Sequence, residues 1–443
     1  MGKKSTMFKI IMPLNMIIGL RFLGLFIVLP VLSVYALQFK GSNELLVGIA
    51  IGGYAATQML LQVPFGMLSD KIGRKTTLTI GLIIFMIGSL VAASADDIYM
   101  LIFGRLLQGA GAIGAVATAM ISDLVKEEKR AHAMAMMGGT IAMTFAVSMV
   151  LGPLLSAMWG LSSLFIITAL CALLAIVVLH TIVKTPPTIS HDYKNDKKEI
   201  FAILKDKNLM KMNITNMLQK GMMTLAFLII PIIMVREFGY EKTQLWQVYV
   251  PAMVFGIFAM GFSAVMGEKK KKPKLVLISG ILLFGLAYTI MGYASSPLVF
   301  IIGVIVFFIG FNVHEPLLQS LASKYAKIHQ KGTALGIFNS FGYLGTFTGA
   351  LWGGHVLKWY GLEYIAMAVL VACVFWVILI ISLENPIFSK NLYLEFGKYD
   401  EQKTEELNST RGVIEWYKNE NEKLLVIKYN SKEISKERLL SLM

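Results

Sequence analysis

Six charged or polar side chains interrupt stretches of sequence that are otherwise apolar, and they are the first candidates for chemistry. They are Arg21, Arg105, Lys220, Asn312, His314 and Glu315. An ionisable group inside a membrane-spanning helix is costly to bury and is usually retained for a function, such as moving a proton or an ion. If the apolar stretches are membrane spans, we expect these residues to line a central cavity and to handle protons or substrate.

Glu315 is the candidate proton carrier, because no other carboxylate lies deep in an apolar stretch of the C-terminal half. A carboxylate held away from water can change its protonation in response to modest changes in its surroundings. The next residue, Pro316, should release a backbone carbonyl toward the cavity. The alternative is a permanent ion pair between Glu315 and Lys220 or Arg21 that only ties two helices together.

His314 and Lys220 each allow two interpretations. A histidine can titrate near neutral pH, but a single histidine in a span is often a hydrogen-bonded packing residue. Lys220 would repel a cationic compound if it faced the cavity, which would favour neutral, zwitterionic or anionic cargo. It could instead extend back toward the membrane surface, because it lies only about two turns from the end of its stretch.

A polar loop follows the second apolar stretch and holds two glycines, Gly66 and Gly73, that should allow a tight reversal. Asp70 could face the positive end of a neighbouring helix, and Arg74 should stay in water. Asp123, after the fourth stretch, could complete a charge cluster with these two residues. The alternative is a set of exposed ion pairs, worth about 0 to 1 kcal/mol each.

The fifth apolar stretch ends with a small residue followed by a Gly-Pro pair, namely Ser148, Gly152 and Pro153. Small residues allow two helices to approach closely, and proline weakens the backbone hydrogen-bond ladder. We expect close packing and a bend at this place.

The elements that must position these residues are apolar helices. Of the 443 residues, 56% are hydrophobic and 15% are charged, whereas charged residues make up about a quarter of an ordinary soluble domain. A helix needs roughly 20 mainly apolar residues to cross the hydrocarbon core. Twelve stretches qualify, near residues 10–37, 45–67, 76–95, 97–122, 131–155, 160–183, 212–236, 244–267, 274–294, 297–321, 332–355 and 361–383.

The basic residues predict how the chain is oriented. Most of the 41 Lys and Arg residues lie on the side of the N-terminus, and only Lys40, Arg236, Lys242 and Lys358 lie in the loops of the other side. Basic loops stay in the cytoplasm, so we expect a multi-pass protein of the cytoplasmic (inner) membrane with both termini cytoplasmic.

Four regions follow from these stretches. We expect an N-terminal six-helix bundle (1–183), a cytoplasmic linker (184–211), a C-terminal six-helix bundle (212–385) and a small cytoplasmic α+β domain (386–443). In the last region the pattern predicts strands at 392–396, 413–417 and 424–429 and helices at 401–408 and 435–442. This β-α-β-β-α order is typical of a ferredoxin-like fold.

Several classes of function are excluded. The net charge of +14 is spread between apolar runs and not over one surface, so nucleic acid is not an expected partner. Cys171 and Cys373 lie inside apolar stretches without the spacing of metal ligands, and the tail has no Cys pair or His, so no metal site is expected. The sequence shows no evident pair of a catalytic nucleophile and a general base, so an enzyme is not expected. No phosphate-binding Gly-Lys-Ser/Thr loop is present, which disfavours ATP as the energy source.

The motifs together resemble the major facilitator superfamily. The loop with Gly66, Asp70, Gly73 and Arg74 is similar to the family's signature loop, in the same place between the second and third spans. The segment after Arg105 looks like the motif of a buried arginine in span 4. The Ser148-to-Pro153 segment is similar to the antiporter motif of drug-exporting branches, with serine where that motif has its first glycine.

A narrower resemblance, to YajR-type transporters, covers nearly the whole chain. It rests on the segments at 21–32, 122–124, 311–315 and 331–336. Those proteins are regarded as drug–proton antiporters with an extra cytoplasmic domain after the last span. The resemblance implies a part for Arg105 in proton or substrate coupling, and a gate at Asp70, Arg74 and Asp123 that locks the outward-facing state.

The function expected from residues and resemblance is proton-coupled export of drugs or other small amphipathic compounds by alternating access. The partners would be the small-molecule substrate, protons and the lipid bilayer, and the protein would act as a monomer, without a cofactor and driven by the proton gradient. Two alternatives stay open, which are a specific metabolite exporter and a membrane sensor that signals through the C-terminal domain.

Overall fold

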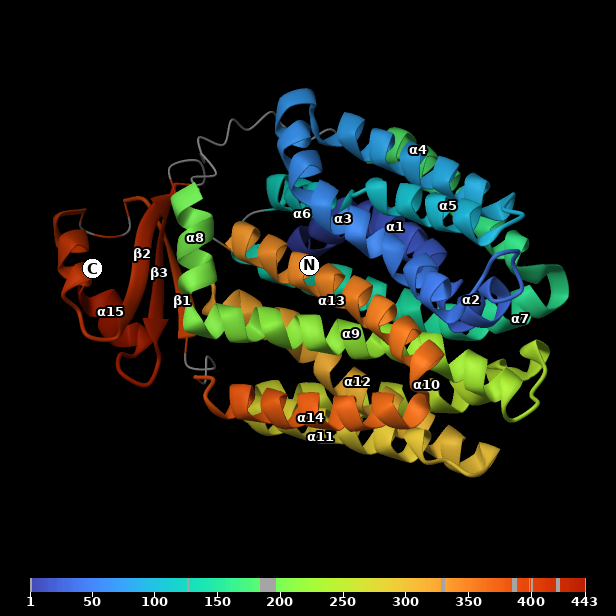
Figure 1. Cartoon of the computed structure of the whole chain (residues 1–443). Helices are drawn as coiled ribbons and strands as arrows, with labels where there is room; N and C mark the ends of the chain where they lie inside the picture. The colour runs from blue at the N-terminus through green and yellow to red at the C-terminus, as the bar shows by residue number, and fades with distance from the viewer. Residues whose placement is uncertain are drawn as a thin grey trace.

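The structure is a computed structural model of the 443-residue chain. It describes residues 2–125, 127–183, 197–327, 331–384, 389–397, 399, 401–419 and 423–442. Long apolar helices run side by side through most of the molecule, and a small sheet packs at one end (Figure 1). We call the end with the sheet the tail side and the opposite end the far side.

The first half of the chain forms one helical bundle. Its helices are α1 (Gly2–Phe26), α2 (Leu29–Ala36), α3 (Glu44–Ile72), α4 (Arg74–Ala93), α5 (Ile98–Ala110), α6 (Gly114–Leu124) and α7 (Glu127–Thr181). The second half forms the other bundle, with α9 (Lys207–Arg236), η1 (Lys242–Gln244), α10 (Trp246–Ala264), η2 (Val265–Lys269), α11 (Pro273–Gly292), α12 (Pro297–Tyr325), α13 (Lys331–Trp359) and α14 (Leu362–Ile381). In the sequence, α8 (Lys197–Lys205) follows the first bundle and precedes the second, within the predicted linker. Residues 184–196 of that linker lie outside the described part of the chain.

The twelve predicted spans are confirmed. Ten described segments are long and apolar enough to cross a membrane. One of them, Met136–Thr181, has 46 residues and reverses at Gly160, where φ is 76°, so it crosses twice. The remaining span is α13, whose 29 residues pack against α3 and α9 (Figure 1). The outward faces are apolar, and on α14 the side chains of Val371, Val374 and Ile378 are largely exposed, as lipid contact requires.

Two spans are broken where the sequence predicts continuous helices. The first is interrupted at residues 27–28, between α1 and α2, and the fourth at residues 111–113, between α5 and α6. Such breaks free backbone N–H and C=O groups, which a membrane tolerates only where protein or a polar cavity meets them. At the second break, the carbonyl oxygen of Gly111 accepts a hydrogen bond from Arg21.

The two bundles meet at the membrane centre and on the far side. There α3 packs along α13, α2 along α9 and α7 along α10. The Ser33 hydroxyl donates a hydrogen bond to the carbonyl oxygen of Phe227 at 3.2 Å, and Arg236 pairs with Glu44 at 2.6 Å. Gly48 of α3 lies so close to the carbonyl of Ala350 in α13 that a side chain would overlap it. The far side is therefore closed.

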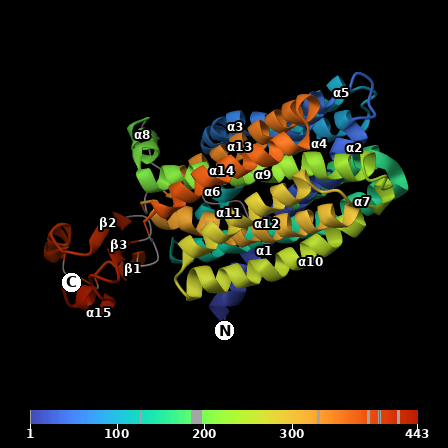
Figure 2. The same ribbon diagram turned by 60° about the horizontal axis from the view of Figure 1, so that its bottom comes forward.

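The C-terminal domain is a three-stranded sheet with two short helices (Figures 1 and 2). Strands β1 (Ser389–Glu395), β2 (Val413–Asn419) and β3 (Leu424–Asn430) lie in the order β1-β3-β2, with β3 antiparallel to both neighbours. The segment after β1 is a 3₁₀ helix, η4 (Glu401–Asn408), and the chain ends with α15 (Lys436–Leu442). This order matches the split β-α-β unit of the predicted ferredoxin-like pattern.

Candidate functional site

Glu315 and Lys220 form an ion pair inside the C-terminal bundle. The Lys220 ammonium lies 2.9 Å from each carboxylate oxygen of Glu315, and the Gln219 amide donates to one of those oxygens at 2.9 Å. The side chains are 25% and 30% exposed. Lys220 therefore reaches across from α9 to α12 and does not extend to the membrane surface. The ion pair between Glu315 and Lys220 that the sequence allowed as an alternative is therefore present.

Arg21 lies in α1, the first helix of the N-terminal bundle, as Lys220 lies in α9, the first helix of the C-terminal bundle. The Arg21 side chain is 1% exposed. Its Nη2 donates to the amide oxygen of Gln58 at 3.1 Å and to the carbonyl oxygen of Gly111, at the break between α5 and α6, at 3.0 Å. The Gln58 amide in turn donates to the Tyr343 hydroxyl at 2.7 Å. Since Tyr343 belongs to α13, this chain of hydrogen bonds links the two bundles.

A row of aromatic rings connects these two polar centres. The guanidinium of Arg21 lies 5.8 Å from the ring centre of Phe22. From there the rings of Phe22, Phe26, Phe145 and Phe311 follow one another with centre-to-centre distances of 5.3, 5.2 and 5.5 Å. Phe311 lies 5.4 Å from the Lys220 ammonium. The row crosses from one bundle to the other and has a charged group at each end.

Arg105 is held entirely by neutral groups. It is fully buried, and its Nε donates to the carbonyl oxygen of Ala50 at 3.1 Å and its Nη1 to the amide oxygen of Gln108 at 2.5 Å. Its guanidinium lies over the ring of Tyr54 at 4.7 Å. These contacts join α5 to α3, so Arg105 holds together two helices that border the site.

His314 and Asn312 face away from the Glu315 pair, and placing them in the central cavity was wrong. His314 is 0% exposed, its Nε2 lies 2.7 Å from the carbonyl oxygen of Leu277 in α11, and its ring packs against Trp376. Asn312 bonds the carbonyl of Phe308 one turn back and packs against Gly256 of α10. Adjacent positions on a helix point about 100° apart, so Glu315 turns away from His314 and toward Lys220 and Gln219 of α9.

The signature loop departs from expectation in two ways. Gly66 lies inside α3, next to α6, so the reversal happens at Gly73 alone, where φ is 92° and glycine is favoured. Arg74 is not in water. Its side chain is 11% exposed and lies 2.5 Å from Asp70 and 2.9 Å from Asp123. The charge cluster therefore forms, and its three members belong to the N-terminal bundle.

The Gly-Pro segment of α7 packs against the break between α1 and α2. A side chain on Gly152 would overlap the carbonyl of Ile27, and Ser148 is fully buried. The helix remains continuous through Pro153, and the turn in the chain comes later, at Gly160. Close approach is thus the main structural contribution of Ser148 and Gly152.

The structure adds residues that the sequence reading missed. They are Gln58, Gln62 and Tyr343 around Arg21, and the phenylalanines of the aromatic row. Gln58 and Gln62 are spaced by four residues in an apolar stretch and so share one helix face, which was a signal available in the sequence. The aromatic row could not be predicted from the sequence, because its members come from three helices, α1, α7 and α12, that are far apart in the chain.

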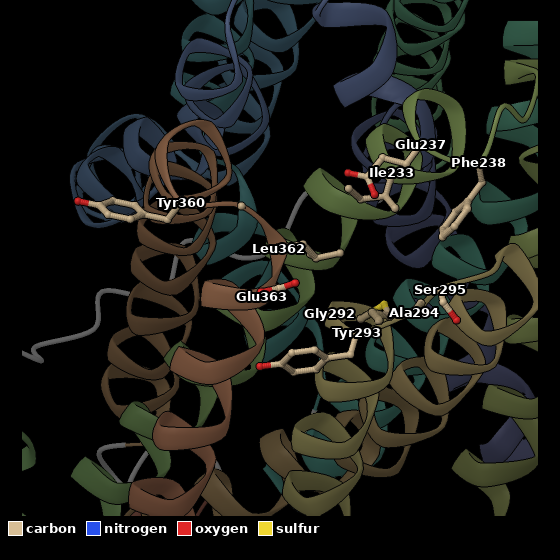
Figure 3. A pocket seen from close by; sticks show the side chains of 12 residues that line it. Ile233, Glu237, Phe238, Gly292, Tyr293, Ala294, Ser295, Tyr360, Leu362 and Glu363 are labelled. Atoms are coloured by element: carbon tan, nitrogen blue, oxygen red, sulfur yellow. The ribbon is translucent and has the colours of Figure 1, made fainter.

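No metal site competes with this interpretation within the described residues, since no group of three or more His, Cys, Asp or Glu side chains comes together there. A surface pocket lies at the far-side ends of α9, α11 and α14, lined by Glu237, Tyr293, Tyr360 and Glu363 among others (Figure 3). None of the predicted site residues lines it, so it is separate from the polar centre.

Comparison with known proteins identifies the class. Two six-helix bundles around a polar, aromatic centre define a multi-pass membrane transporter. The profile of the Major Facilitator Superfamily matches residues 14–350. The chain belongs to that superfamily.

Individual relatives agree with this assignment. The inner membrane transport protein YajR of Escherichia coli strain K12 is 33% identical over 427 residues, which are 95% of this chain and 93% of the relative. The class E tetracycline resistance protein of Escherichia coli is 25% identical over 76% of this chain and 84% of that protein. The solved structure of the nucleoside transporter NupG superposes with a TM-score of 0.66 at 14% identity, covering 84% of this chain and 99% of that one, and shows the shared fold alone.

Proposed function

We propose that this protein is a proton-coupled antiporter that exports small amphipathic compounds across the cytoplasmic membrane by alternating access. The observation that carries the proposal is the partly buried ion pair of Lys220 and Glu315 at one end of an aromatic row. A resistance protein for tetracycline among the relatives supports a role in export. In this proposal the tail side is cytoplasmic, the protein works as a monomer, and the proton gradient supplies the energy without a cofactor.

The ion pair suits proton exchange because it can exist in two forms. With Glu315 ionised, Lys220 and Gln219 hold the carboxylate by hydrogen bonds from α9. When Glu315 takes up a proton, its charge disappears and the attraction to Lys220 is lost. Lys220 is then free to interact with cargo along the aromatic row. Binding of the proton and binding of the cargo would thus compete at one place, as antiport requires.

The signature loop would stiffen the tail-side end of the N-terminal bundle. Arg74 with Asp70 and Asp123 fixes the tail-side ends of α3, α4 and α6 relative to one another. The N-terminal bundle can therefore move as a rigid unit against the C-terminal bundle. Far-side contacts between α3 and α13 would open when the tail side closes, and this exchange is the alternating access of the proposal.

The test is efflux of a fluorescent drug panel from proteoliposomes under an imposed pH gradient. We expect gradient-driven flux with the wild type and none with Glu315→Gln, whose amide cannot exchange a proton. The matched control is Glu363→Gln, because Glu363 is an exposed carboxylate at the far-side end of α14. Equal flux of Glu315→Gln and wild type would remove Glu315 from the coupling mechanism.

A sensor is the second candidate, and one observation favours it. Lys428 of β3 is 5% exposed and donates hydrogen bonds to the carbonyl oxygens of Lys324 and Ala326 at the end of α12, the helix that carries Glu315. The sheet is thus attached to the helix of the ion pair. Deleting residues 386–443 separates the candidates, since an exporter keeps gradient-driven flux without the domain and a sensor loses its function.

A further inference from the structure

The break between α5 and α6 leaves a helix N-terminus near the membrane centre. Helix α6 begins at Gly114 and has 11 residues, and its N-cap residue, Ile113, supplies no side-chain hydrogen bond to the first turn. The first N–H groups of a helix lack partners inside the helix and carry a partial positive charge. Broken membrane helices often direct such an end at an anionic group of the substrate.

Three polar side chains converge on this helix end. A side chain at Gly114 would begin 3.8 Å from the amide nitrogen of Gln58, 3.8 Å from the hydroxyl of Tyr343 and 3.9 Å from the amide oxygen of Gln62. Outside its own helix no atom comes closer to that point, so a methyl group at Gly114 would make ordinary contacts with these three side chains. Gln58 and Gln62 belong to α3 and Tyr343 to α13, which places this point between the two bundles.

Arg21 adds an incompletely satisfied cation to the same cluster. Its Nη2 bonds Gln58 and Gly111, but its Nε and Nη1 are buried without a hydrogen-bond partner among the described residues, as is the amide oxygen of Gln62. Buried polar atoms nearly always have partners, so these N–H groups are available to a ligand. Donors dominate this cluster, and a ligand that suits it should therefore supply acceptors.

The balance of charge points to the sign of that partner. In the described helices of the N-terminal bundle, carboxylates occur only near helix ends, at Glu44, Asp70, Asp123, Glu127 and Glu128. Arg21 and Arg105 thus have no carboxylate partner near the membrane centre. In the C-terminal bundle Lys220 is neutralised by Glu315. The centre of the protein carries an excess of positive charge, and an uncompensated buried cation is costly.

We propose that the cluster of Arg21, Gln58, Gln62, Tyr343 and the N-terminus of α6 binds the anionic group of the cargo, so that the transported compounds are organic anions. The claim that organic anions are transported rests on the proposed function, whereas the claim that the cluster binds an anion does not. The oxyanion, a carboxylate or a sulfonate, accepts hydrogen bonds from the Arg21 guanidinium, the Tyr343 hydroxyl and the α6 N–H groups. The Gln62 amide turns to present its N–H₂.

The aromatic row takes up the rest of the cargo. Phe22 touches the Arg21 end, and Phe26, Phe145 and Phe311 continue toward Lys220. An apolar body of aromatic character would stack on Phe22 and Phe26, which are partly buried, whereas Phe145 and Phe311 are only 6% and 3% exposed. A cargo held there would contact the N-terminal bundle through these two rings and the other bundle through Tyr343 of α13.

The experiment uses three probes with one apolar body and different head groups: 4-phenylbutyrate, 4-phenylbutylamine and 4-phenylbutanol. The melting temperature of the detergent-purified full chain is measured against probe concentration at neutral pH, since a ligand that binds the folded state raises it. We expect the anion to bind at least ten-fold more tightly than the amine and the alcohol. An amine or alcohol that binds as tightly overturns the proposal, and so does the absence of any shift.

Variants locate the binding. Gly114→Leu fills the space beside the polar cluster, and Arg21→Gln removes the cation. We expect each to weaken 4-phenylbutyrate binding by about ten-fold or more, the loss of a charge-assisted hydrogen bond. Arg21→Lys, which keeps the charge, should retain part of the affinity. The control is Gly261→Leu on the exposed face of α10, where no atom lies within 4 Å, and it should bind as wild type does.

Unchanged anion binding in both Gly114→Leu and Arg21→Gln would place the anion elsewhere and overturn the site. The melting transition without probe shows in each case that the variant is folded. A separate outcome concerns the proposed function alone. If 4-phenylbutyrate binds as described but no pH gradient drives its flux in proteoliposomes, antiport fails and the anion site stands. If the gradient drives flux of cationic drugs only, antiport stands and the anion site fails.

Discussion

The Lys220 ammonium lies 2.9 Å from both carboxylate oxygens of Glu315, and both residues belong to the same bundle. The pair connects α9 with α12 and does not hold the two bundles together. Its side chains are neither fully buried nor free in solvent. Loss of the pair on protonation can therefore change the site without pulling the bundles apart, which is the property that a coupling residue needs.

The first prediction concerns the strength of this pair. Lys220→Met leaves the Glu315 carboxylate without its cation, and Glu315→Gln leaves the Lys220 ammonium without its anion. We expect each single variant to lower the melting temperature, and the double variant to recover part of the loss, with a coupling energy of about 1 kcal/mol. Additive effects of the two changes would show that the ion pair contributes nothing to stability.

The second prediction concerns Arg74, which is expected to be structural as well as functional. Arg74→Met removes the guanidinium from Asp70, from Asp123 and from the hydroxyl of Ser69. Loss of hydrogen bonds to a charged group costs about 1.5 to 3 kcal/mol. We expect a clear fall in melting temperature.

Lys71→Met is the matched control for Arg74→Met, because Lys71 is an exposed cation in the last turn of α3, next to Asp70. Its melting temperature should stay close to that of the wild type. Equal effects of the two variants would mean that the cluster is a set of solvated surface charges, as the alternative reading of the sequence has it.

The parts of the fold that the sequence predicts are those with a strong compositional signal. Twelve apolar stretches and the alternation of short strands in the tail identify the helices and the sheet. The breaks at 27–28 and 111–113 were missed because the residues there are apolar like their neighbours, although Pro30 in the first turn of α2 and Gly111 at the end of α5 were available signals. Backbone groups freed by a break are satisfied by distant residues, such as Arg21 at Gly111, and a local pattern holds no information about them.

The direction of a side chain was equally hard to predict for α12. This helix is apolar on almost every face, so the spacing of its residues does not distinguish the side toward the other bundle from the side toward α10 and α11. Asn312, His314 and Glu315 were grouped because they are adjacent in sequence. The structure separates them, because α11 and α10 supply partners for His314 and Asn312 while α9 supplies Lys220 for Glu315.

The third prediction concerns closure of the far side. Gly48→Ala places a methyl group against the carbonyl of Ala350, so α3 and α13 must separate there. If this contact forms once in every transport cycle, a cost of about 1.4 kcal/mol slows turnover ten-fold. Gradient-driven flux in proteoliposomes measures the effect.

Gly53→Ala is the control, because the nearest atom to a methyl group at this position is a Leu106 methyl at 3.5 Å, an ordinary contact within the same bundle. We expect its flux to stay near the wild-type rate. Normal flux of Gly48→Ala would show that the close approach of α3 and α13 is not part of the cycle.

The last prediction concerns the attachment of the C-terminal domain. Along β3, Leu425, Ile427 and Tyr429 face the domain's own core, so Lys428 points from the opposite face of the sheet. Its ammonium lies 2.9 Å from the carbonyl oxygen of Lys324 and 2.7 Å from that of Ala326. These carbonyls end α12, where the helix dipole is negative and a cation is favourable.

Lys428→Met keeps the methylene stem of the side chain but removes the donor, so the sheet should detach from α12 while its own core stays intact. We expect proteolysis in the junction before β1 to release the domain about ten-fold faster, as a loss of about 1.4 kcal/mol of docking energy implies. Lys436→Met, on the exposed side of α15, should be cleaved as the wild type is. If Lys428→Met also changes the pH dependence of flux, then the domain acts on the helix of Glu315. Unchanged flux with faster cleavage would make the contact an anchor without influence on transport.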